Sequence, residues 1–302
     1  MQELECVDCP LCNLNNFKIH VIAKDYLFSK KEFTVVRCES CGLIFTNPRV
    51  KENLIAHYYF SDYIQHREIT KLTNFQRAKN SLGYLFKNPY KKILKALRST
   101  NAKTVLEVGA GEGSLLNYLK KNGLNVTGVE RDRNCVRRIR AMDITCYSGD
   151  LNEVVSKIGF KKFDAVVFHH AFEHLYNPKK TLSNIYNLLN EKGIIYLSVP
   201  NINSIEARLF GKYWKGLDLP RHTIHYDINS IKNFLSEAKF KIINLESDIF
   251  PSSFIESIGF FLLKQRMPLN IYYLFYYPWK LLAPIHTKVI GSGVMSVVAK
   301  KC

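Results

Sequence analysis

The chain has 302 residues, of which 47% are hydrophobic, and carries a formal net charge of +17. This length can bury a full α/β core and still carry a small appended module. The basic balance favours anionic partners such as nucleic acid, acidic lipid head groups or phosphorylated substrates, and it carries no information about the fold. Met1 to Glu5 lack the basic and apolar regions of a secretory leader, so the eight cysteines argue against a disulfide framework and predict a reducing, cytoplasmic setting.

Residues 1–50 hold two CxxC pairs and are expected to form a zinc-binding, cysteine-rich module. Two such knuckles can present four thiolates to one tetrahedral ion, which closes its coordination sphere and makes the site structural. The expected ligands are Cys9, Cys12, Cys38 and Cys41. Cys6 has the same spacing to Cys9 and could replace it as a ligand. The β-rich run from Phe33 to Arg37 predicts a hairpin strand that leads into the second knuckle.

Residues 51–103 predict a basic helical linker that is also rich in aromatic residues. The aromatic positions are Tyr58, Tyr59, Tyr63 and Phe75. Between Arg67 and Lys103 there are ten Lys or Arg residues and one acid, Glu68. This stretch fits either a solvated helix face or a docking surface for an anionic partner.

A buried strand at 104–108 runs into the glycine-rich turn Gly109-Ala110-Gly111-Glu112-Gly113, and a helix is expected from Ser114. Glycine serves where a turn needs positive φ or where a ligand lies against bare backbone, and the helix N-terminus offers unpaired N–H groups. The next strand, 125–129, ends at Glu130, whose carboxylate is placed to bind the two hydroxyls of a ribose. The pattern therefore predicts a nucleotide-binding crossover.

The glycines at 109, 111 and 113 alternate, whereas a dinucleotide fingerprint has its second and third glycines three apart. With Glu107 two residues before the first glycine, the stretch resembles the E/DxGxGxG motif of class I S-adenosylmethionine-dependent methyltransferases. The resemblance implies that Glu107 reaches the methionine end of the cofactor and that Glu130 holds the ribose. An α/β domain with an ordinary glycine turn is the alternative interpretation.

The remaining elements predict an α/β, Rossmann-like domain over residues 104–302. Strands are expected near 104–108, 125–129, 144–147, 164–168, 193–199, 240–246 and 293–299. Strands that alternate with helices imply a parallel sheet whose ligands lie at the carboxyl ends of the strands. By its resemblance to the family, the sheet should have seven strands with the last one antiparallel, and the N-terminal module should be zinc-ribbon-like. In related enzymes, helices at the place of Tyr58 and Tyr59 cover the cofactor.

Two positions after strands resemble further cofactor-binding positions of the family. Asp150, after the third strand, resembles the acid that hydrogen-bonds the adenine amino group. After the fourth strand comes His169-His170-Ala171-Phe172-Glu173-His174-Leu175, similar to an EHL segment that borders adenosine and substrate, and His170 is the expected cofactor contact. Histidine can serve there as a base, a metal ligand or a hydrogen bonder, or it can satisfy local backbone only.

The segment 202–226 is an insertion after the fifth strand. It contains Trp214 and Pro220-Arg221-His222-Thr223-Ile224-His225-Tyr226, and resembles the W…PRHxxHF/Y segment of small-molecule and quinone-type methyltransferases. His222 is the expected general base and His225 the second candidate, because a neutral imidazole can accept a hydroxyl proton. A loop held by Pro220 and stacked aromatics without chemistry is the alternative.

A second insertion, 249–290, is rich in apolar and aromatic residues. Neither of its apolar runs reaches about eighteen residues, so a membrane span is not expected. Tyr and Trp interleaved with Lys264, Arg266 and Lys280 suit peripheral contact with the inner face of a membrane. A hydrophobic cap or a dimer interface would explain the same composition.

Together these patterns predict methyl transfer from S-adenosylmethionine to a small-molecule, sugar or lipid-linked acceptor. The chain is similar to deoxysugar C-methyltransferases, which also begin with a zinc module, but those enzymes carry a Glu-His pair where this chain has Arg221-His222. The attacked atom is therefore expected to be a hydroxyl oxygen and the acceptor to be anionic. RNA methylation is the competing activity, although motifs of nucleic-acid base methylases are not recognised, and a catalytically inactive membrane-associated module is the other alternative.

Overall fold

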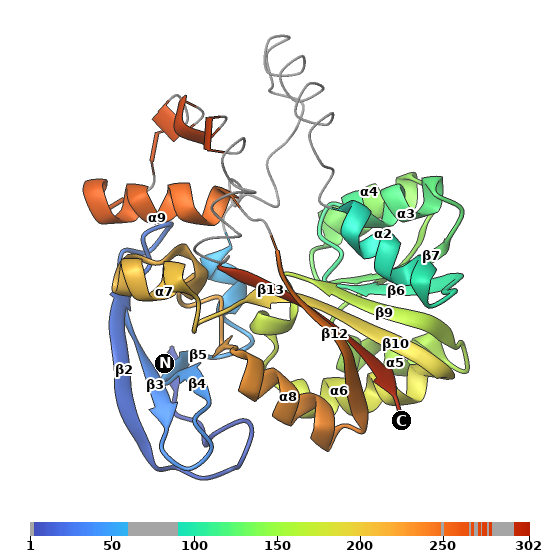
Figure 1. The fold of residues 1–302 in the computed structure, drawn as a ribbon, viewed down its shortest axis with the longest axis horizontal. Coiled ribbons are helices and arrows are strands. Elements are labelled where there is room, and N and C mark those ends of the chain that lie inside the picture. The colour runs from blue at the N-terminus through green and yellow to red at the C-terminus, as the bar shows by residue number, and fades with distance from the viewer. Residues whose placement is uncertain are drawn as a thin grey trace. The chain divides into compact units, whose positions relative to one another are not determined.

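The computed structural model describes residues 3–59, 90–248, 251–265, 267–268, 271–272, 274–276, 278–279 and 293–302. These residues belong to two compact units (Figure 1). The first unit comprises Met1–Tyr59, His170–Ser183 and Leu197–Ala299, and the second comprises Phe60–His169, Asn184–Tyr196 and Lys300–Cys302. Most of the expected linker, including Tyr63 and Phe75, and parts of the 249–290 insertion lie outside the described residues.

The second unit is built on four parallel strands. They are β6 (Thr104–Val108), β7 (Asn125–Glu130), β8 (Thr145–Ser148) and β9 (Phe163–His169). In the register of the sheet, Leu106 of β6 lies opposite Thr127 of β7 and Val166 of β9. The central strands are apolar and buried because parallel strands of this kind are covered on both faces.

Helices alternate with these strands, as expected for a crossover sheet. They are α2 (Tyr90–Ser99), α3 (Ser114–Lys121), α4 (Arg133–Ala141) and α5 (Leu151–Ile158), of which α2, α3 and α4 are grouped in Figure 1. Asp132 and Asp150 occupy the N-caps of α4 and α5 and accept backbone N–H bonds there. These caps fix where each helix begins, close to the carboxyl end of the preceding strand.

The complete sheet has seven strands in the order β12-β13-β10-β9-β6-β7-β8. The other three strands are β10 (Leu189–Pro200), β12 (Phe240–Asp248) and β13 (Val294–Lys301), and the last is antiparallel. The predicted α/β, seven-stranded fold is confirmed. The largest boundary difference lies in β10, which begins at Leu189 instead of at residue 193.

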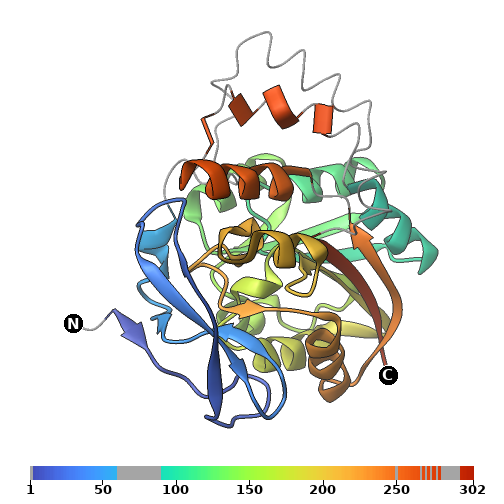
Figure 2. The ribbon, with the colours of Figure 1, turned by 60° about the vertical axis from the view of Figure 1, so that its left-hand side comes forward.

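The first unit contains an antiparallel sheet with the order β11-β4-β3-β2, whose long hairpin is drawn in blue in Figure 2. The hairpin pairs β2 (Phe17–Lys24) with β3 (Glu32–Cys38), and β4 (Ile44–Thr46) follows the second knuckle. The fourth strand, β11 (Ile224–His225), comes from the 202–226 segment. Ile224 pairs with Phe45 and His225 with Ile44, so this segment completes the sheet of the N-terminal module.

The first unit also contains several short helices and α-helices. They include η1 (Ile55–Tyr58), η4 (Phe172–His174), α7 (Ile205–Phe210), η5 (Gly211–Tyr213), η6 (Lys215–Leu217), α8 (Ile228–Glu237) and α9 (Pro251–Leu263). A short sheet joins β1 (Leu4–Glu5) to β5 (Arg49–Val50), and α6 spans Pro178–Leu188. Phe33 and Val35 of β3 share one buried core with Trp214 and Leu219. Among the described helices, none has the length and apolar character needed to cross a bilayer.

Candidate active site and metal centre

The glycine turn after β6 adopts the left-handed backbone that its sequence predicts. Gly109, Gly111 and Gly113 have φ values of 74°, 51° and 75°. A Cβ at Gly113 would lie 2.6 Å from Cγ1 of Ile139, so this glycine permits close packing of α4. A Cβ at Gly111 would meet nothing within 4 Å, so the backbone there faces open space. Gly113 is therefore needed for packing, whereas Gly111 leaves backbone that a ligand can approach.

Two carboxylates flank this turn, the buried Glu107 and the half-buried Glu130. Glu130 holds the turn, because its Oε2 accepts the backbone N–H of Gly111 at 2.7 Å and its Oε1 accepts that of Asp132 at 2.9 Å. Glu107 is 3% exposed, and its Oε2 has no hydrogen-bond partner among the described residues. Burial, together with the charge of Glu130, raises the pKa of Glu107 well above its usual value. A cationic ligand group beside Glu107 would restore its ionised form.

Asp150 is engaged by protein groups on both oxygens. Its Oδ1 accepts the backbone N–H of Asn152 at 2.8 Å, and its Oδ2 lies 2.9 Å from Nη2 of Arg131. The amide of Gly149 donates to the carbonyl of Glu130, which brings the ends of β7 and β8 together. The expected contact of Asp150 with adenine stays a prediction.

Three residues of the predicted catalytic region converge in the first unit: Glu173, His174 and His222. One donor atom of each lies within 4.8 Å of the others. Nδ1 of His222 lies 2.8 Å from the carbonyl oxygen of Gly216, and Nδ1 of His174 lies 2.9 Å from that of Arg221. Because a carbonyl can only accept, both Nδ1 atoms carry hydrogen and both Nε2 atoms carry the lone pair in the neutral rings.

Glu173 lies between these imidazoles and is 1% exposed. Oε1 of Glu173 is 3.9 Å from Nε2 of His222 and 3.6 Å from Nδ1 of His170, beyond hydrogen-bond reach. Burial raises the pKa of Glu173, but the nearby His170, His222 and His174 outweigh it and bring the pKa to about 2. Burial lowers the pKa of His222 to about 4, so its imidazole is neutral at pH 7.

His225 and His170, the other two predicted histidines, have different surroundings. His225 lies in β11, and its Nε2 is 3.2 Å from Oγ1 of Thr46 in the neighbouring strand. Burial lowers the pKa of His225 to about 3, and its Nδ1 has no partner among the described residues. His170 takes the uncommon φ of 56°, and its backbone N–H donates to the carbonyl of Ser198. The ring centroids of His222 and His225 are 6.5 Å apart.

Arg221 holds the loop that carries His222. Its guanidinium is 1% exposed and donates to Oδ1 of Asp25, to Oδ1 of Asp218 and to the carbonyl of Tyr58. The charges of Arg221 and Lys215 outweigh the burial of Asp218 and hold its pKa well below its usual value. Oδ2 of Asp218 lies 3.7 Å from Nε2 of His222, which adds a second carboxylate beside this ring.

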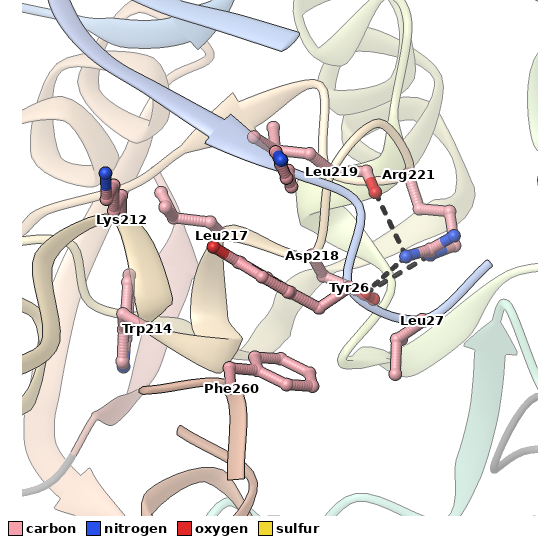
Figure 3. Close-up of a pocket in the computed structure, with 10 residues that line it drawn as sticks. Tyr26, Leu27, Lys212, Trp214, Leu217, Asp218, Leu219, Arg221 and Phe260 are labelled. Atoms are coloured by element: carbon pink, nitrogen blue, oxygen red, sulfur yellow. Dashed lines mark hydrogen bonds and ion pairs between the residues drawn. The ribbon is translucent and has the colours of Figure 1, made fainter. Parts of the chain in front are cut away.

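A small pocket lies beside the Arg221 loop (Figure 3). Lys24, Tyr26 and Leu27 line it from the end of the hairpin. The other lining residues are Lys212, Trp214, Leu217, Asp218, Leu219, Arg221 and Phe260. Figure 3 shows Arg221 held against Asp218 and the carbonyl of Leu219, on the inner side of this pocket. Lys24 and Lys212 contribute basic side chains to this lining, and Asp218 contributes a carboxylate that Arg221 and Lys215 pair.

The four predicted zinc ligands come together in the first unit. Sγ of Cys9 lies 3.4 Å from that of Cys41, and Sγ of Cys12 lies 3.5 Å from that of Cys38. A tetrahedral ion with Zn–S bonds of about 2.3 Å holds its sulfurs roughly 3.8 Å apart, and a disulfide would need about 2.05 Å. All four donor atoms lie within 4.8 Å of one another, whereas Cys6 is exposed and is not in the cluster. The donor set therefore fits zinc.

The sequence placed Glu173 and His174 in the segment expected to border adenosine and substrate without giving either a specific role, and it did not single out Asp25 or Asp218. The Glu-His-Leu triplet after the fourth strand was a usable signal for the first two. Asp25 gives no local signal, because its role depends on Arg221, which is 196 residues away.

Comparison with known proteins places this geometry in a family. Residues 74–245, more than half of the chain, match the family described as "Methyltransferase domain". A sequence of Geobacillus sp. (strain WCH70) that carries a methyltransferase name is 27% identical over 205 residues, which cover 52% of this chain and 81% of that protein. A relative from Invertebrate iridescent virus 6, also with a methyltransferase name, is 24% identical over 180 residues, covering 51% of this chain and 63% of its own.

Solved structures with a similar fold include a SAM-dependent methyltransferase from Archaeoglobus fulgidus. It is 17% identical, with 74% of this chain and 99% of that chain covered and a TM-score of 0.49. A TehB-like SAM-dependent methyltransferase from Corynebacterium glutamicum is 15% identical, with 76% and 97% covered and a TM-score of 0.45. By its sequence match over residues 74–245, the chain belongs to the methyltransferase-domain family and is a class I S-adenosylmethionine-dependent methyltransferase.

Proposed function

We propose that this methyltransferase acts on a hydroxyl oxygen of a small-molecule, sugar or lipid-linked acceptor, and that His222 takes up the hydroxyl proton. The observation that carries the proposal is the hydrogen bond from Nδ1 of His222 to the carbonyl of Gly216. It fixes the tautomer in which Nε2 has a free lone pair, and the lowered pKa keeps that ring neutral. A neutral imidazole held in one orientation is suited to general-base catalysis.

The second unit contains the residues proposed to hold the cofactor. S-adenosylmethionine supplies a methyl group bonded to a sulfonium sulfur. The positive charge on the sulfur makes the methyl carbon electrophilic. The open backbone at Gly111 offers a surface for a ligand, and the orphaned Oε2 of Glu107 offers an acceptor for its cationic groups. Glu130, held by two backbone amides, is proposed to bind the ribose hydroxyls, with Asp150 as a further contact. The expected cofactor contact of His170, a residue of the first unit, stays a prediction.

The pocket of Figure 3 favours an anionic acceptor. Lys24 and Lys212 line it together with Tyr26, Trp214 and Phe260, so a phosphate or carboxylate on a ring or lipid could bind there. The overall charge of +17 also favours an anionic acceptor, because it raises the local concentration of anions.

Exposed apolar residues near the end of α9, such as Phe261 and Leu262, also suit peripheral contact with a membrane that carries a lipid-linked acceptor. A structural zinc ion held by Cys9, Cys12, Cys38 and Cys41 is part of the proposal.

The test combines cofactor binding with turnover. Calorimetric titration with S-adenosylmethionine is expected to show one site, after which acceptors are screened with labelled methyl donor. The variant His222→Asn keeps a donor at the Nδ1 position and removes Nε2, so it should bind the cofactor normally and lose at least about 100-fold in turnover. His225→Gln is the comparison for a buried histidine in the same segment. Unchanged turnover in His222→Asn would contradict the assigned base, and absence of cofactor binding in the wild type would contradict the activity.

A further inference from the structure

We propose that Glu173, His174 and His222 bind a divalent transition-metal ion, of the zinc or manganese type, at a site separate from the four cysteines. The inference rests on the geometry of these three side chains and does not depend on the proposed function. Their donor atoms lie within 4.8 Å of one another, and Nε2 of His222 is 3.9 Å from Oε1 of Glu173, whereas a tetrahedral ion with bonds of about 2.05 Å holds its ligand atoms roughly 3.4 Å apart. The exposed fractions of Glu173 and His222 are 1% and 7%, so these two ligands lie in the interior.

The hydrogen-bond pattern shows why a cation suits this cluster. Nδ1 of His174 and Nδ1 of His222 both face carbonyl oxygens and therefore carry the ring hydrogens. Both Nε2 atoms are left as acceptors, and Glu173 adds two carboxylate oxygens that have no hydrogen-bond donor among the described residues. Nε2 of His222 and Oε1 of Glu173, 3.9 Å apart, thus face each other with no hydrogen atom between them, and a donor atom of His174 lies within 4.8 Å of both, an arrangement that a bound cation satisfies.

The protein also holds the two imidazoles as metal-binding histidines are usually held. In such sites the non-ligating ring nitrogen donates to a carbonyl or carboxylate, which fixes the orientation of the ring. Here the carbonyls of Arg221 and Gly216 do this, and the hydroxyl of Tyr59 lies 3.0 Å from Nδ1 of His174 as well. The ring centroids of His174 and His222 are 4.7 Å apart in an edge-to-face arrangement.

The charges around the cluster are compatible with a dication. Oδ2 of Asp218 lies 3.7 Å from Nε2 of His222, and Nδ1 of His170 lies 3.6 Å from Oε1 of Glu173. Arg221 and Lys215 face the opposite oxygen of Asp218 at 2.9 and 3.1 Å. The carboxylates of Asp218 and Glu173 are therefore the anionic groups that lie beside the lone pair of His222.

Two imidazoles and one carboxylate select the class of ion. Imidazole nitrogen suits zinc, iron, copper or nickel, and the carboxylate also suits manganese, whereas magnesium and calcium prefer sites made of oxygen ligands alone. Three protein ligands leave an open coordination position, as in catalytic zinc sites, where an oxygen ligand such as water or a hydroxyl can bind. With the ion in place, Nε2 of His222 is occupied as a ligand, so His222 serves as the general base of the proposed function only in the metal-free protein.

The experiment is metal titration of the full-length protein without cofactor or acceptor. After metal removal, Co²⁺ is added stepwise and absorption is recorded, with metal content measured by mass spectrometry after reconstitution with Zn²⁺. The wild type is expected to bind two ions per chain. The cysteine site should give intense thiolate-to-cobalt bands, and the second ion should add weaker bands without thiolate character. Because no methyl transfer is involved, failure of the proposed function leaves this result unaffected.

The variants Glu173→Gln and His222→Asn should weaken the second site by more than about 100-fold and leave the thiolate bands intact. Retained thiolate bands show that the cysteine module of each variant is folded. The exposed His57 provides the control, because His57→Gln should bind two ions as the wild type does. A wild type that saturates with one ion would overturn the proposal, as would a second ion that persists unchanged in both variants.

Discussion

Arg221 and Asp25 form a buried ion pair in which Nη2 lies 2.9 Å from Oδ1, although 196 positions separate the two residues in the sequence. The pair joins the turn of the N-terminal hairpin to the loop that carries His222. Asp25 also accepts the backbone N–H groups of Leu27, Phe28 and Ser29, so it organises the turn and the loop at once. The orientation of His222 therefore depends on the N-terminal module.

Loss of this ion pair should destabilise the first unit strongly. Asp25→Ala leaves the buried guanidinium of Arg221 with one carboxylate fewer, and breaking a buried pair costs about 3–5 kcal/mol. Denaturant unfolding of the wild type and the variant measures the difference. Glu32→Ala is the matched control in the same hairpin, because Glu32 pairs with Lys24 at 4.0 Å on the surface, where a pair contributes at most about 1 kcal/mol. A loss in Asp25→Ala no larger than in Glu32→Ala would contradict the anchoring role.

Zinc should be required for the fold of the N-terminal module. Cys38 ends β3 and Cys41 lies just before β4, so an ion bound there ties the hairpin to the strand that pairs with β11. Cys38→Ser is expected to lose the thiolate-to-cobalt bands and to lower the melting temperature, because binding to such a site contributes folding free energy. Cys302→Ser changes an exposed cysteine outside the cluster and should do neither. Normal cobalt bands in Cys38→Ser would exclude it as a ligand.

Glu206 should make the stability of the first unit depend on pH. It is 3% exposed, and burial raises its pKa to about 7 from the usual 4.5. The folded state then binds more protons than the unfolded state between these two values, so stability should fall as pH rises from about 4.5 to 7. The full effect is at most on the order of 3 kcal/mol. Unfolding at several pH values should show a flatter profile for Glu206→Gln, whereas the exposed Glu191→Gln should keep the wild-type slope.

The sequence was sufficient for those parts of the protein that depend on local pattern. The strand before Gly109, the positive φ of the three glycines and the convergence of the four cysteines follow from short-range rules. The pairing of His225 with Ile44 could not be predicted, because two-residue strands have no periodicity and this one completes a sheet from another part of the chain. The same holds for Asp25, whose role appears only when Arg221 lies beside it.

The histidines show a second limit of the sequence. His222 and His225 share one motif and one residue type, so the reason given for a general base applied equally to both. Their environments differ because the β11 register directs His225 to Thr46, whereas the ring of His222 lies beside Glu173 and His174. Hydrogen-bond partners, which determine the tautomer, come only from the folded arrangement.

Gly111 should be required for cofactor binding and contribute little to packing. Gly111 and Gly159 share a positive φ, 51° and 67°, and in both a Cβ would meet nothing within 4 Å. Gly111→Val and Gly159→Val each place a side chain on a backbone of positive φ, which costs at least about 1–2 kcal/mol, and denaturant unfolding measures the strain of each variant. Only Gly111 lies in the turn between Glu107 and Glu130, so calorimetry should show loss of S-adenosylmethionine binding in Gly111→Val and near-normal affinity in Gly159→Val. Wild-type affinity in both variants would mean that the cofactor does not approach the backbone at Gly111. Equal losses of both stability and affinity in the two variants would instead trace the effect to backbone strain.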